Sequence, residues 1–403
     1  MWVNPFITIS EILLLILMFP LGYLLLLAIG AFRSASKPQT YLRSPSNRFI
    51  IVIPAHNEAS IIGATVKRLQ AIDYPPDLFS IHIIADHCSD DTAEVARRAG
   101  AVVYERNEGP RSGKGAALLW LFQRILDKDV CDAVVIFDAD TQADPGFLRV
   151  MDWRLAQGDR VIQGQHIIGN PDQGWLPALV WAMFLIDNRF QNLGRTNLGW
   201  SAKNMGDSIC FSVDVLRQVG WGEGLTEDYH LRLILLLNGI RIVYEPAAIG
   251  YGEAPLNLAS ARDQRVRWLR GTYDAKKQIV IRLIIEGMKR RNLAMLDGAL
   301  QASFPSYSTL SVLSLIVLVA HVPVNHFSNP VNLWPQIVAW AAVVGTLFIY
   351  PLVGLALERA PIKAYLVILS GPYFILWRTW LAFISRFAGK QVTWIRTEHG
   401  KLM

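Results

Sequence analysis

Acidic residues at the ends of apolar runs are the first indication of chemistry in this sequence. Asp138 and Asp140 are separated by one residue and directly follow an apolar run. Two carboxylates at this spacing can bind a divalent cation that bridges a diphosphate, because Mg²⁺ is held by a few carboxylates together with phosphate oxygens. Asp86 follows another apolar run in the same way. We therefore interpret Asp138 and Asp140 as a site for Mg²⁺ or Mn²⁺, with Asp86 on the same rim.

A second motif, Gly113–Lys114–Gly115, opens a predicted helix. Glycines beside a helix N-terminus suit a phosphate group, and Lys114 adds a cation. The motif is not a Walker A loop, since Gly109 stands one residue too close and Gly115 replaces Ser or Thr. No Gly-x-Gly-x-x-Gly follows the first predicted strand, which disfavours a dinucleotide-binding dehydrogenase. A purely conformational role of the glycines in a turn is the alternative.

Thr226–Glu227–Asp228 precedes a predicted helix at 229–237. Acidic residues at a helix start often act only as caps, worth about 1 kcal/mol. The functional interpretation is a general base, because sugar transfer with inversion needs a carboxylate that takes the proton of the acceptor hydroxyl.

The motif Gln264–Arg265–Val266–Arg267–Trp268 combines an amide, two guanidinium groups and an aromatic ring. The ring can stack on a sugar, while the amide and a guanidinium group can hold hydroxyls or a diphosphate. A basic and aromatic belt at a membrane interface is the alternative for this motif.

These residues need a scaffold that brings them together, and the alternation of strand and helix patterns predicts one. The predicted strands are 49–52, 80–85, 101–104 and 133–137, and the helices between them are 61–69, 92–99 and 116–126. This order implies a mostly parallel sheet with helices on its faces. In such sheets the ligand site lies beyond the carboxyl ends of the strands. Pro54, His56 and Glu58 follow the first strand and are therefore expected near Asp86 and Asp138.

The composition indicates membrane segments attached to a soluble domain. Hydrophobic residues make up 52% of the chain and charged residues 18%, against roughly 25% charged residues in soluble domains. The apolar run 5–32 is long enough to span a bilayer, and the absence of a basic residue before it disfavours a cleaved signal peptide. Four basic residues, Arg33, Lys37, Arg43 and Arg48, follow this run. The positive-inside rule therefore places the N-terminus outside and the domain in the cytosol.

Hydrophobicity returns near the C-terminus. We predict spans at 307–321 and 333–357, whereas the apolar stretch 364–387 is interrupted by Pro372 and Arg378. Two spans already return the chain to the cytosol, which the basic tail prefers, so this last stretch is interpreted as interfacial or re-entrant. The mixture of basic and aliphatic residues at 274–292 predicts an amphipathic helix on the inner membrane surface.

From these patterns we divide the chain into five parts. They are an N-terminal transmembrane helix at 1–33, a cytosolic domain at 48–275, an interfacial helix at 276–293, membrane segments at 304–387 and a cytosolic tail at 388–403.

Taken in order, the motifs resemble those of family-2 glycosyltransferases with a GT-A fold and membrane segments. This group contains cellulose, chitin and hyaluronan synthases and ceramide glucosyltransferases, and the bacterial exopolysaccharide subgroup is the most similar. The motifs are Ile-Pro-Ala-His-Asn-Glu, Ala-Asp-His-Cys-Ser-Asp-Asp-Thr, Gly-Lys-Gly, Phe-Asp-Ala-Asp, Leu-Thr-Glu-Asp and Gln-Arg-Val-Arg-Trp. The resemblance covers residues 48–275 and depends on the order and spacing of the motifs. It implies an α/β GT-A domain with a mostly parallel sheet, flanked by transmembrane helices.

The resemblance also implies roles for individual residues. Asp86 would contact the nucleotide base, Asp140 more than Asp138 would bind the metal, and Asp228 would be the catalytic base. The implied donor-binding residues are Pro54, His56, Glu58, Asp86, Lys114, Asp138, Asp140, Gln264, Arg267 and Trp268. The implied acceptor-binding residues are Asp207, Glu227 and Trp268. Trp394 is similar to a tail tryptophan common in these proteins, which supports a cytosolic C-terminus.

One segment departs from the family pattern. Where relatives have a Gly-rich turn facing the acceptor, residues 203–211 include Lys203 and Asp207. The added charge leaves room for an acceptor that differs from that of the exopolysaccharide enzymes.

The resemblance implies an inverting, metal-dependent glycosyltransferase in the cell membrane, with several spans and a cytosolic catalytic domain. It would move a sugar from a UDP-sugar onto a lipid, a lipid-linked or a growing polysaccharide acceptor. A processive synthase working as an oligomer is an alternative, and so are a non-catalytic membrane protein that binds nucleotide sugars and a soluble nucleotidyltransferase. Nucleic-acid binding is disfavoured, because the basic residues concentrate at the membrane borders rather than on one stripe.

Overall fold

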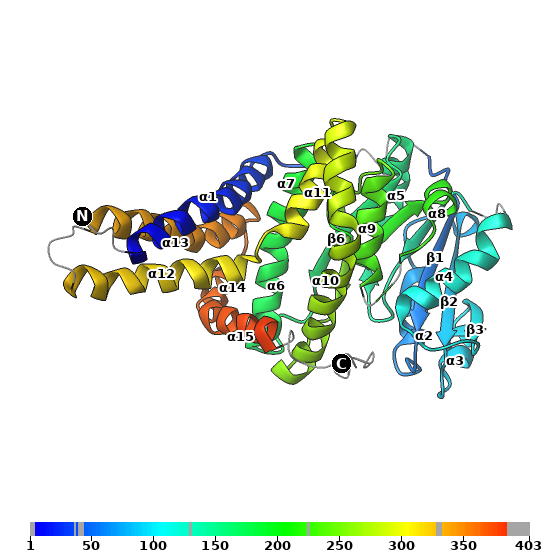
Figure 1. Cartoon of the computed structure of the whole chain (residues 1–403). Coiled ribbons are helices and arrows are strands. Elements are labelled where there is room, and N and C mark those ends of the chain that lie inside the picture. Colours follow the sequence, from blue (N-terminus) through cyan, green and yellow to red (C-terminus); the bar gives the residue numbers. More distant parts are fainter. Residues whose placement is uncertain are drawn as a thin grey trace.

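The fold is that of a computed structural model, which describes residues 5–35, 38, 44–128, 131–222, 224, 226–327 and 333–384. Figure 1 shows an α/β domain at one end, long apolar helices extending from the other end, and a layer of helices between them. Three features predicted from the sequence, Lys37, Arg43 and the tail 388–403 with Trp394, lie outside the described residues.

An eight-stranded sheet forms the centre of the α/β domain, in the order β3-β2-β1-β4-β7-β6-β8-β5. The strands are β1 Phe49–Ala55, β2 Phe79–Asp86, β3 Val102–Arg106, β4 Ala133–Ile136, β5 Gln142–Ala143, β6 Val161–Ile168, β7 Ile209–Ser212 and β8 Val243–Gly252. Strands β3, β2, β1 and β4 are parallel, as are β6 and β8, whereas β7 runs antiparallel to both its neighbours and β5 runs antiparallel to β8. The predicted α/β fold with a mostly parallel sheet is therefore confirmed.

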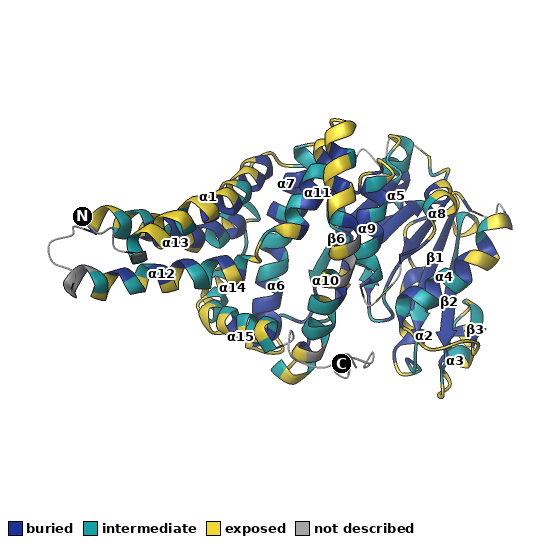
Figure 2. Ribbon diagram, in the orientation of Figure 1, coloured by how far each residue is buried: buried dark blue, intermediate teal, exposed yellow. Residues whose placement is uncertain are grey.

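Helices cover both faces of this sheet. They are α2 Ile62–Gln70, α3 Thr92–Arg98, α4 Lys114–Ile125, α5 Phe147–Ala156, α8 Val213–Val219 and α9 Glu227–Leu237. Alternate residues of β1 enter two separate cores, since Ile50 packs with α4, α8 and α9 while Ile51 packs with α2, α3 and α5. Burial on both faces explains why the central strands are continuous apolar runs, and Figure 2 shows these strands buried between the helices.

Three helices are long and apolar enough to cross a membrane within the described part of the chain. They are α1 Pro5–Ala31, α12 Tyr307–Phe327 and α13 Trp334–Leu357. They coincide with the three predicted spans. The fourth apolar stretch forms two helices, α14 Ile362–Ile368 and α15 Gly371–Ile384, bent by 51°. A broken span or a re-entrant loop both have this shape, and the predicted orientation of the spans stays a prediction.

The layer between the α/β domain and the spans contains helices that the sequence analysis did not predict. They are α6 Trp175–Asp187, the π-helical turn η4 Asn188–Leu193, α7 Gly194–Asn197 and α11 Leu293–Ser303. Helix α10 runs from Leu258 to Lys289, so the amphipathic segment predicted at 274–292 is the second half of a longer helix that also carries the Gln264–Trp268 motif.

A buried polar network joins α1 to the α/β domain. The Asp297 carboxylate of α11 accepts hydrogen bonds from Tyr23 of α1 at 2.6 Å and from Arg195 of α7 at 3.1 Å. Arg232 of α9 lies 3.7 Å from the same carboxylate and donates to the carbonyl oxygen of Ala202 at 2.8 Å. Arg195, Arg232 and Asp297 are buried. Helix α1 is therefore attached to α9, the helix that begins with Glu227 and Asp228.

Candidate active site

One large cavity, of about 2180 Å³, opens at the carboxyl ends of the strands and continues between α6, α10 and the apolar helices. All the residues predicted for the site line it: Pro54, His56, Glu58, Asp86, Lys114, Asp138, Asp140, Asp207, Glu227, Asp228, Gln264, Arg267 and Trp268. The structure thus brings together side chains from β1, β2, α4, α9, α10 and the loops between them. Their individual roles stay predictions.

Asp86 ends β2 and is held in place by two neighbouring side chains. Its carboxylate accepts hydrogen bonds from Arg106 at 2.5 Å and from His87 Nδ1 at 2.9 Å. His56 Nδ1 donates to the backbone carbonyl of Asp86 at 2.7 Å. Asp86 and Arg106 are both buried, so this end of the cavity has a fixed polar wall.

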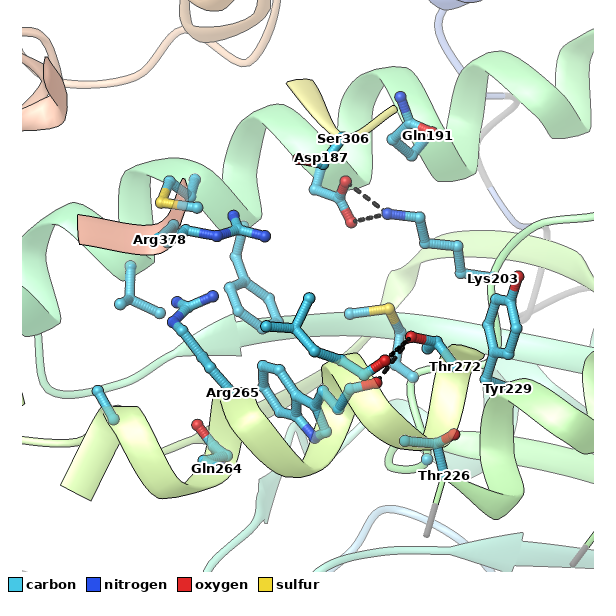
Figure 3. A pocket seen from close by; sticks show the side chains of 18 of the residues that line it. Asp187, Gln191, Lys203, Thr226, Tyr229, Gln264, Arg265, Thr272, Ser306 and Arg378 are labelled. Atoms are coloured by element: carbon cyan, nitrogen blue, oxygen red, sulfur yellow. Dashed lines mark hydrogen bonds and ion pairs between the residues drawn. The ribbon is translucent and has the colours of Figure 1, made fainter. Parts of the chain in front are cut away.

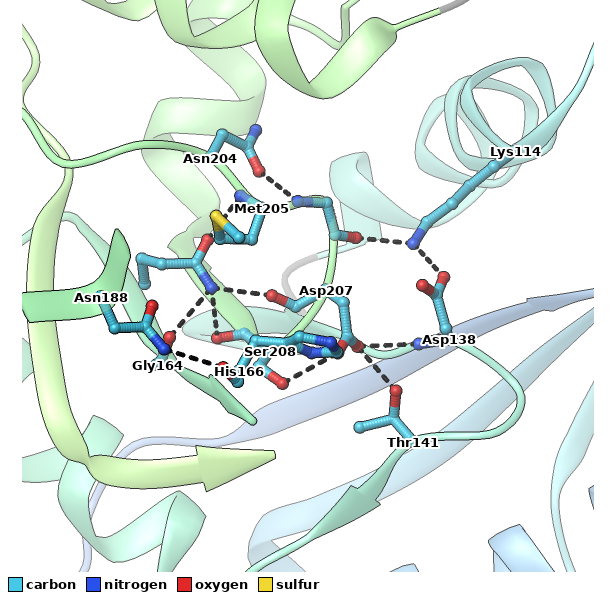
Figure 4. Close-up of polar contacts among 12 residues, drawn as sticks. Lys114, Asp138, Thr141, Gly164, His166, Asn188, Asn204, Met205, Asp207 and Ser208 are labelled. Atoms are coloured by element: carbon cyan, nitrogen blue, oxygen red, sulfur yellow. Dashed lines mark hydrogen bonds and ion pairs between the residues drawn. The ribbon is translucent and has the colours of Figure 1, made fainter. Parts of the chain in front are cut away.

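Lys114 lies over Asp138, as Figure 4 shows. Its ammonium group donates to the Asp138 carboxylate and, at 2.6 Å, to the carbonyl oxygen of Gly206. Burial works against the ammonium ion, but the charges of Asp138 and Asp207 outweigh it and raise the pKa of Lys114. Lys114 is therefore a permanent cation beside the predicted metal carboxylates.

The structure explains why glycine stands on each side of Lys114. Gly113 has φ of 108°, in the region that favours glycine. A Cβ on Gly115 would lie 2.7 Å from Cγ of Glu227. Gly115 thus allows the N-terminus of α4 to approach that of α9, and this approach brings Lys114 and Asp228 into one site.

Asp207 lies beneath the Asp138–Asp140 loop. One carboxylate oxygen accepts from the backbone N–H of Asp138 at 2.9 Å and from Thr141 at 3.0 Å. The other accepts from His166 Nδ1 at 2.7 Å and from Ser208 at 3.1 Å (Figure 4). Asp207 is 2% exposed. Four donors engage both its oxygens, so Asp207 holds the Asp138–Asp140 loop in place, and its contact with an acceptor stays a prediction.

The residues present fit a metal that binds together with a diphosphate. Within the part of the chain that the structure describes, no three His, Cys, Asp or Glu side chains are grouped closely enough to hold a metal ion by themselves. Asp138 and Asp140 nevertheless line the cavity beside each other. Two carboxylates that leave most positions to phosphate and water oxygens are the donor set that Mg²⁺ accepts.

Glu227 and Asp228 start α9 inside the cavity, and both are electrostatically perturbed. Burial raises the pKa of Asp228, although a hydrogen bond from the N–H of Tyr229 and the charge of Lys114 oppose the shift. Burial and the neighbouring Asp228 raise the pKa of Glu227 to about 7. Burial lowers the pKa of Arg267, and the carboxylates of Glu227 and Asp228 oppose this effect. Arg267 is thus close to both acids.

Several residues of this cavity were not predicted as site residues. Asp187 of α6 binds Lys203 with distances of 2.7 and 2.8 Å from the ammonium group to its two oxygens (Figure 3). His166, Arg265 and Arg378 also line the cavity. Two of these residues have a signal in the sequence. His166 is a polar residue inside a strand, and Arg378 is a charged residue inside an apolar stretch.

Comparison with known proteins agrees with this geometry. The model of the family described as "Glycosyltransferase like family 2" matches residues 45–271. A cellulose synthase catalytic subunit [UDP-forming] of Pseudomonas fluorescens is 29% identical over 235 residues, which are 55% of this chain and 30% of that protein. A beta-monoglucosyldiacylglycerol synthase of Trichormus variabilis is 28% identical over 235 residues, 55% of this chain and 48% of that protein. The chain thus spans a third to a half of the length of these relatives.

Among solved structures, a mannosyltransferase of Pyrobaculum calidifontis in complex with GDP-Man and Mn²⁺ has a similar fold. The TM-score is 0.51 at 17% sequence identity, and the match covers 86% of this chain and 99% of the other. This likeness concerns the fold, and it agrees with the GT-A arrangement of sheet and helices.

Proposed function

This chain belongs to glycosyltransferase family 2, and from that premise we propose that it moves a sugar from a UDP-sugar, with inversion, onto a membrane-bound acceptor. The observation that carries the proposal is the meeting of Asp228, Arg267 and the Lys114–Asp138 pair in one cavity that continues to the apolar helices. We propose further that residues 48–275 form the catalytic domain on the cytosolic side of the membrane.

In the proposed reaction the chain's own residues bind the donor and remove a proton. Asp86 holds the nucleotide base, while Lys114 and Arg267 lie along the diphosphate. Asp138 and Asp140 would hold a Mg²⁺ or Mn²⁺ ion, whose positive charge would offset that of the leaving diphosphate. Asp228 takes the proton of the acceptor hydroxyl as its oxygen bonds to the anomeric carbon and the bond from that carbon to the diphosphate breaks. Attack from the face opposite the diphosphate inverts the anomeric centre.

The shape of the cavity supports a lipid or lipid-linked acceptor. Its lining continues from the acids to side chains of α13, α14 and α15, and two of these helices belong to the broken apolar stretch. The three or four candidate spans among the described residues are few to enclose a polysaccharide channel. A growing polysaccharide is the second candidate acceptor, favoured by the cellulose synthase among the relatives, and it would require an oligomer.

The direct test is to purify the chain in lipid and measure UDP release with UDP-glucose, UDP-galactose, UDP-N-acetylglucosamine and UDP-glucuronate. Mass spectrometry of the lipid fraction then identifies the product. Release of UDP together with a glycosylated lipid supports the proposal. A ladder of long saccharides from the isolated monomer would overturn the choice of acceptor.

Chelation should stop the reaction. Because two carboxylates alone bind Mg²⁺ weakly, we expect EDTA to reduce transfer by about a hundredfold and added Mg²⁺ or Mn²⁺ to restore it. Asp140→Asn should raise the metal concentration needed for half-maximal rate. As a control, Asp144→Asn, on the loop beyond this pair, should respond to metal like the unchanged chain. Full transfer in EDTA would refute the metal assignment.

The rate should also fall on acidification. Asp228 acts only as the carboxylate, and its pKa is raised by burial, so kcat/KM should decline by about tenfold per unit below that pKa. The acid limb should therefore lie above the ordinary pKa of an aspartate. Glu227→Gln should leave this acid limb in place, because Glu227, whose pKa is raised to about 7, is already neutral at lower pH. A pH–rate profile with no acid limb above the ordinary aspartate pKa of about 3.9 would contradict the assignment of the base.

A further inference from the structure

Two arginines from different helices face the same part of the cavity, away from the strand ends. Arg265 lies on α10 and Arg378 on α15, and both line the cavity. Figure 3 shows their guanidinium groups turned toward the same space between α6, α10 and α15. Neither residue has a part in the sugar-transfer step described above.

Both guanidinium groups lack a hydrogen-bonded acid within the described part of the chain. The Nε of Arg265 is buried and has no hydrogen-bond partner. Its guanidinium carbon instead lies 4.8 Å from the ring centre of Phe374 on α15 and 5.9 Å from that of Trp268. Asp187 is the acid whose charge acts on Arg378, and Lys203 already binds both its oxygens. Positive charge is therefore in excess here.

The two cations also destabilise each other. Burial, and after it the charge of Arg378, lowers the pKa of Arg265 to about 9. Two like charges facing one low-dielectric space are unfavourable unless an anion binds between them. Guanidinium groups present paired N–H donors that match the oxygens of a phosphate, so a phosphate group would satisfy both arginines at once.

The surroundings of this pair are apolar on the side of the membrane helices. Leu179, Val180 and Met183 of α6 pack in one cluster with Phe374, the ring beside Arg265, and they line the cavity. The outer face of α15 is apolar too, with Leu376 at 59% and Trp380 at 61% exposure, as for a helix in contact with lipid. A ligand that combines a phosphate with an acyl or isoprenoid chain matches both the two arginines and the apolar side chains beside them.

Resting on the function proposed above, we propose that the acceptor is a phosphate-bearing lipid whose phosphate is held between Arg265 and Arg378. The phosphate anchors the acceptor and stays on the product, while the sugar is joined at Asp228 to a hydroxyl oxygen elsewhere on the lipid, on its glycerol or on a sugar that it already carries. A neutral lipid such as diacylglycerol lacks the group that these arginines bind.

Lipid binding measured in the absence of a UDP-sugar tests the phosphate site independently of catalysis. The full chain in neutral detergent is titrated with phosphatidylglycerol, a polyprenyl diphosphate that carries a sugar, and diacylglycerol, and binding is followed by native mass spectrometry. At least one of the two phosphate lipids should bind about tenfold more tightly than diacylglycerol. The lipid that binds more tightly shows whether the acceptor is a glycerophospholipid or an isoprenoid. Arg265→Gln and Arg378→Gln should each remove this preference, and Arg378→Lys should recover part of it.

Lys363→Gln is the matched control. Lys363 lies on α14 and pairs with the exposed Asp172, so this change should leave the preference intact. Equal binding of phosphate and neutral lipids, unaffected by both arginine changes, would overturn the inference. So would displacement of the phosphate lipid by an acidic oligosaccharide. UDP release from UDP-sugars is measured on the same samples. If UDP is released but phosphate lipids bind no better than neutral ones, only the phosphate-bearing acceptor is refuted. If no UDP is released, the proposed function is refuted and this inference with it.

Discussion

Replacing Asp228 with Asn should lower kcat for sugar transfer by about a thousandfold, because the amide cannot take the proton of the acceptor hydroxyl. The change conserves shape, and the N–H of Tyr229 can still bond to the amide oxygen of the new side chain. Donor binding should therefore persist, and the loss should appear in kcat rather than in KM for the donor. Single-turnover transfer with a labelled UDP-sugar, followed by product analysis, measures this directly.

The matched control for this substitution is Asp214→Asn. Asp214 pairs with Arg160 at the surface, where its side chain is 60% exposed, and its loss should leave kcat unchanged. If Asp228→Asn kept more than about a tenth of the transfer rate, proton removal would not be the step that this carboxylate performs.

Replacing Asp297 with Ala should destabilise the protein by about 3–5 kcal/mol, the usual effect of removing one partner of a buried ion pair. Arg195 and Arg232 would then lie buried without the carboxylate that they share. The hydroxyl group of Tyr23 would lose its acceptor as well. Thermal unfolding in detergent should show the loss, and the activity that remains below the unfolding temperature should be largely preserved.

Two further variants separate charge from packing at this position. Asp214→Ala removes an exposed partner and should change stability by no more than about 0.5 kcal/mol. Asp297→Ala combined with Arg195→Met removes two opposite charges and should be more stable than Asp297→Ala alone. An Asp297→Ala protein as stable as the unchanged chain would show that the network does not hold the layers together.

The strand ends of the site are predictable from the sequence because parallel strands buried on both faces appear as apolar runs. Each run stops where the chain leaves the sheet, and Asp86 and Asp138 follow at those points. All thirteen predicted residues line one cavity, since the carboxyl ends of parallel strands meet at one edge. The contacts of an individual residue cannot be predicted from this pattern. The position of Asp207 in the sequence, for example, gives no sign of the four donors around it.

The middle layer was not predictable in the same way. Helix α6 is apolar but has 13 residues, too few to register as a span, and it has no side-chain cap. The starts of α10 and α11, in contrast, carry a capping residue that is visible in the sequence. Asn257 accepts a hydrogen bond from the N–H of Ser260, and Asn292 accepts one from the N–H of Met295, so both are ordinary N-caps.

The pairing of Arg265 with Arg378 could not be predicted at all, because it depends on how α15 packs against α10. The two residues are separated by more than a hundred positions, and the bend between α14 and α15 directs the second helix back toward the cavity. The sequence shows Arg378 only as an interruption of an apolar stretch.

The attachment of α1 to later parts of the chain also sets an order for biosynthesis. Ser10 of α1 bonds to His321 and Trp340, and Tyr23 bonds to Asp297, so these partners are translated long after α1. At roughly 5–20 residues per second, α1, inserted in the bilayer as proposed, would wait on the order of tens of seconds before its polar groups are satisfied. A ribosome that stalls within α10 would therefore hold a nascent chain whose first helix is exposed to the membrane quality-control machinery, even when the sheet is already complete.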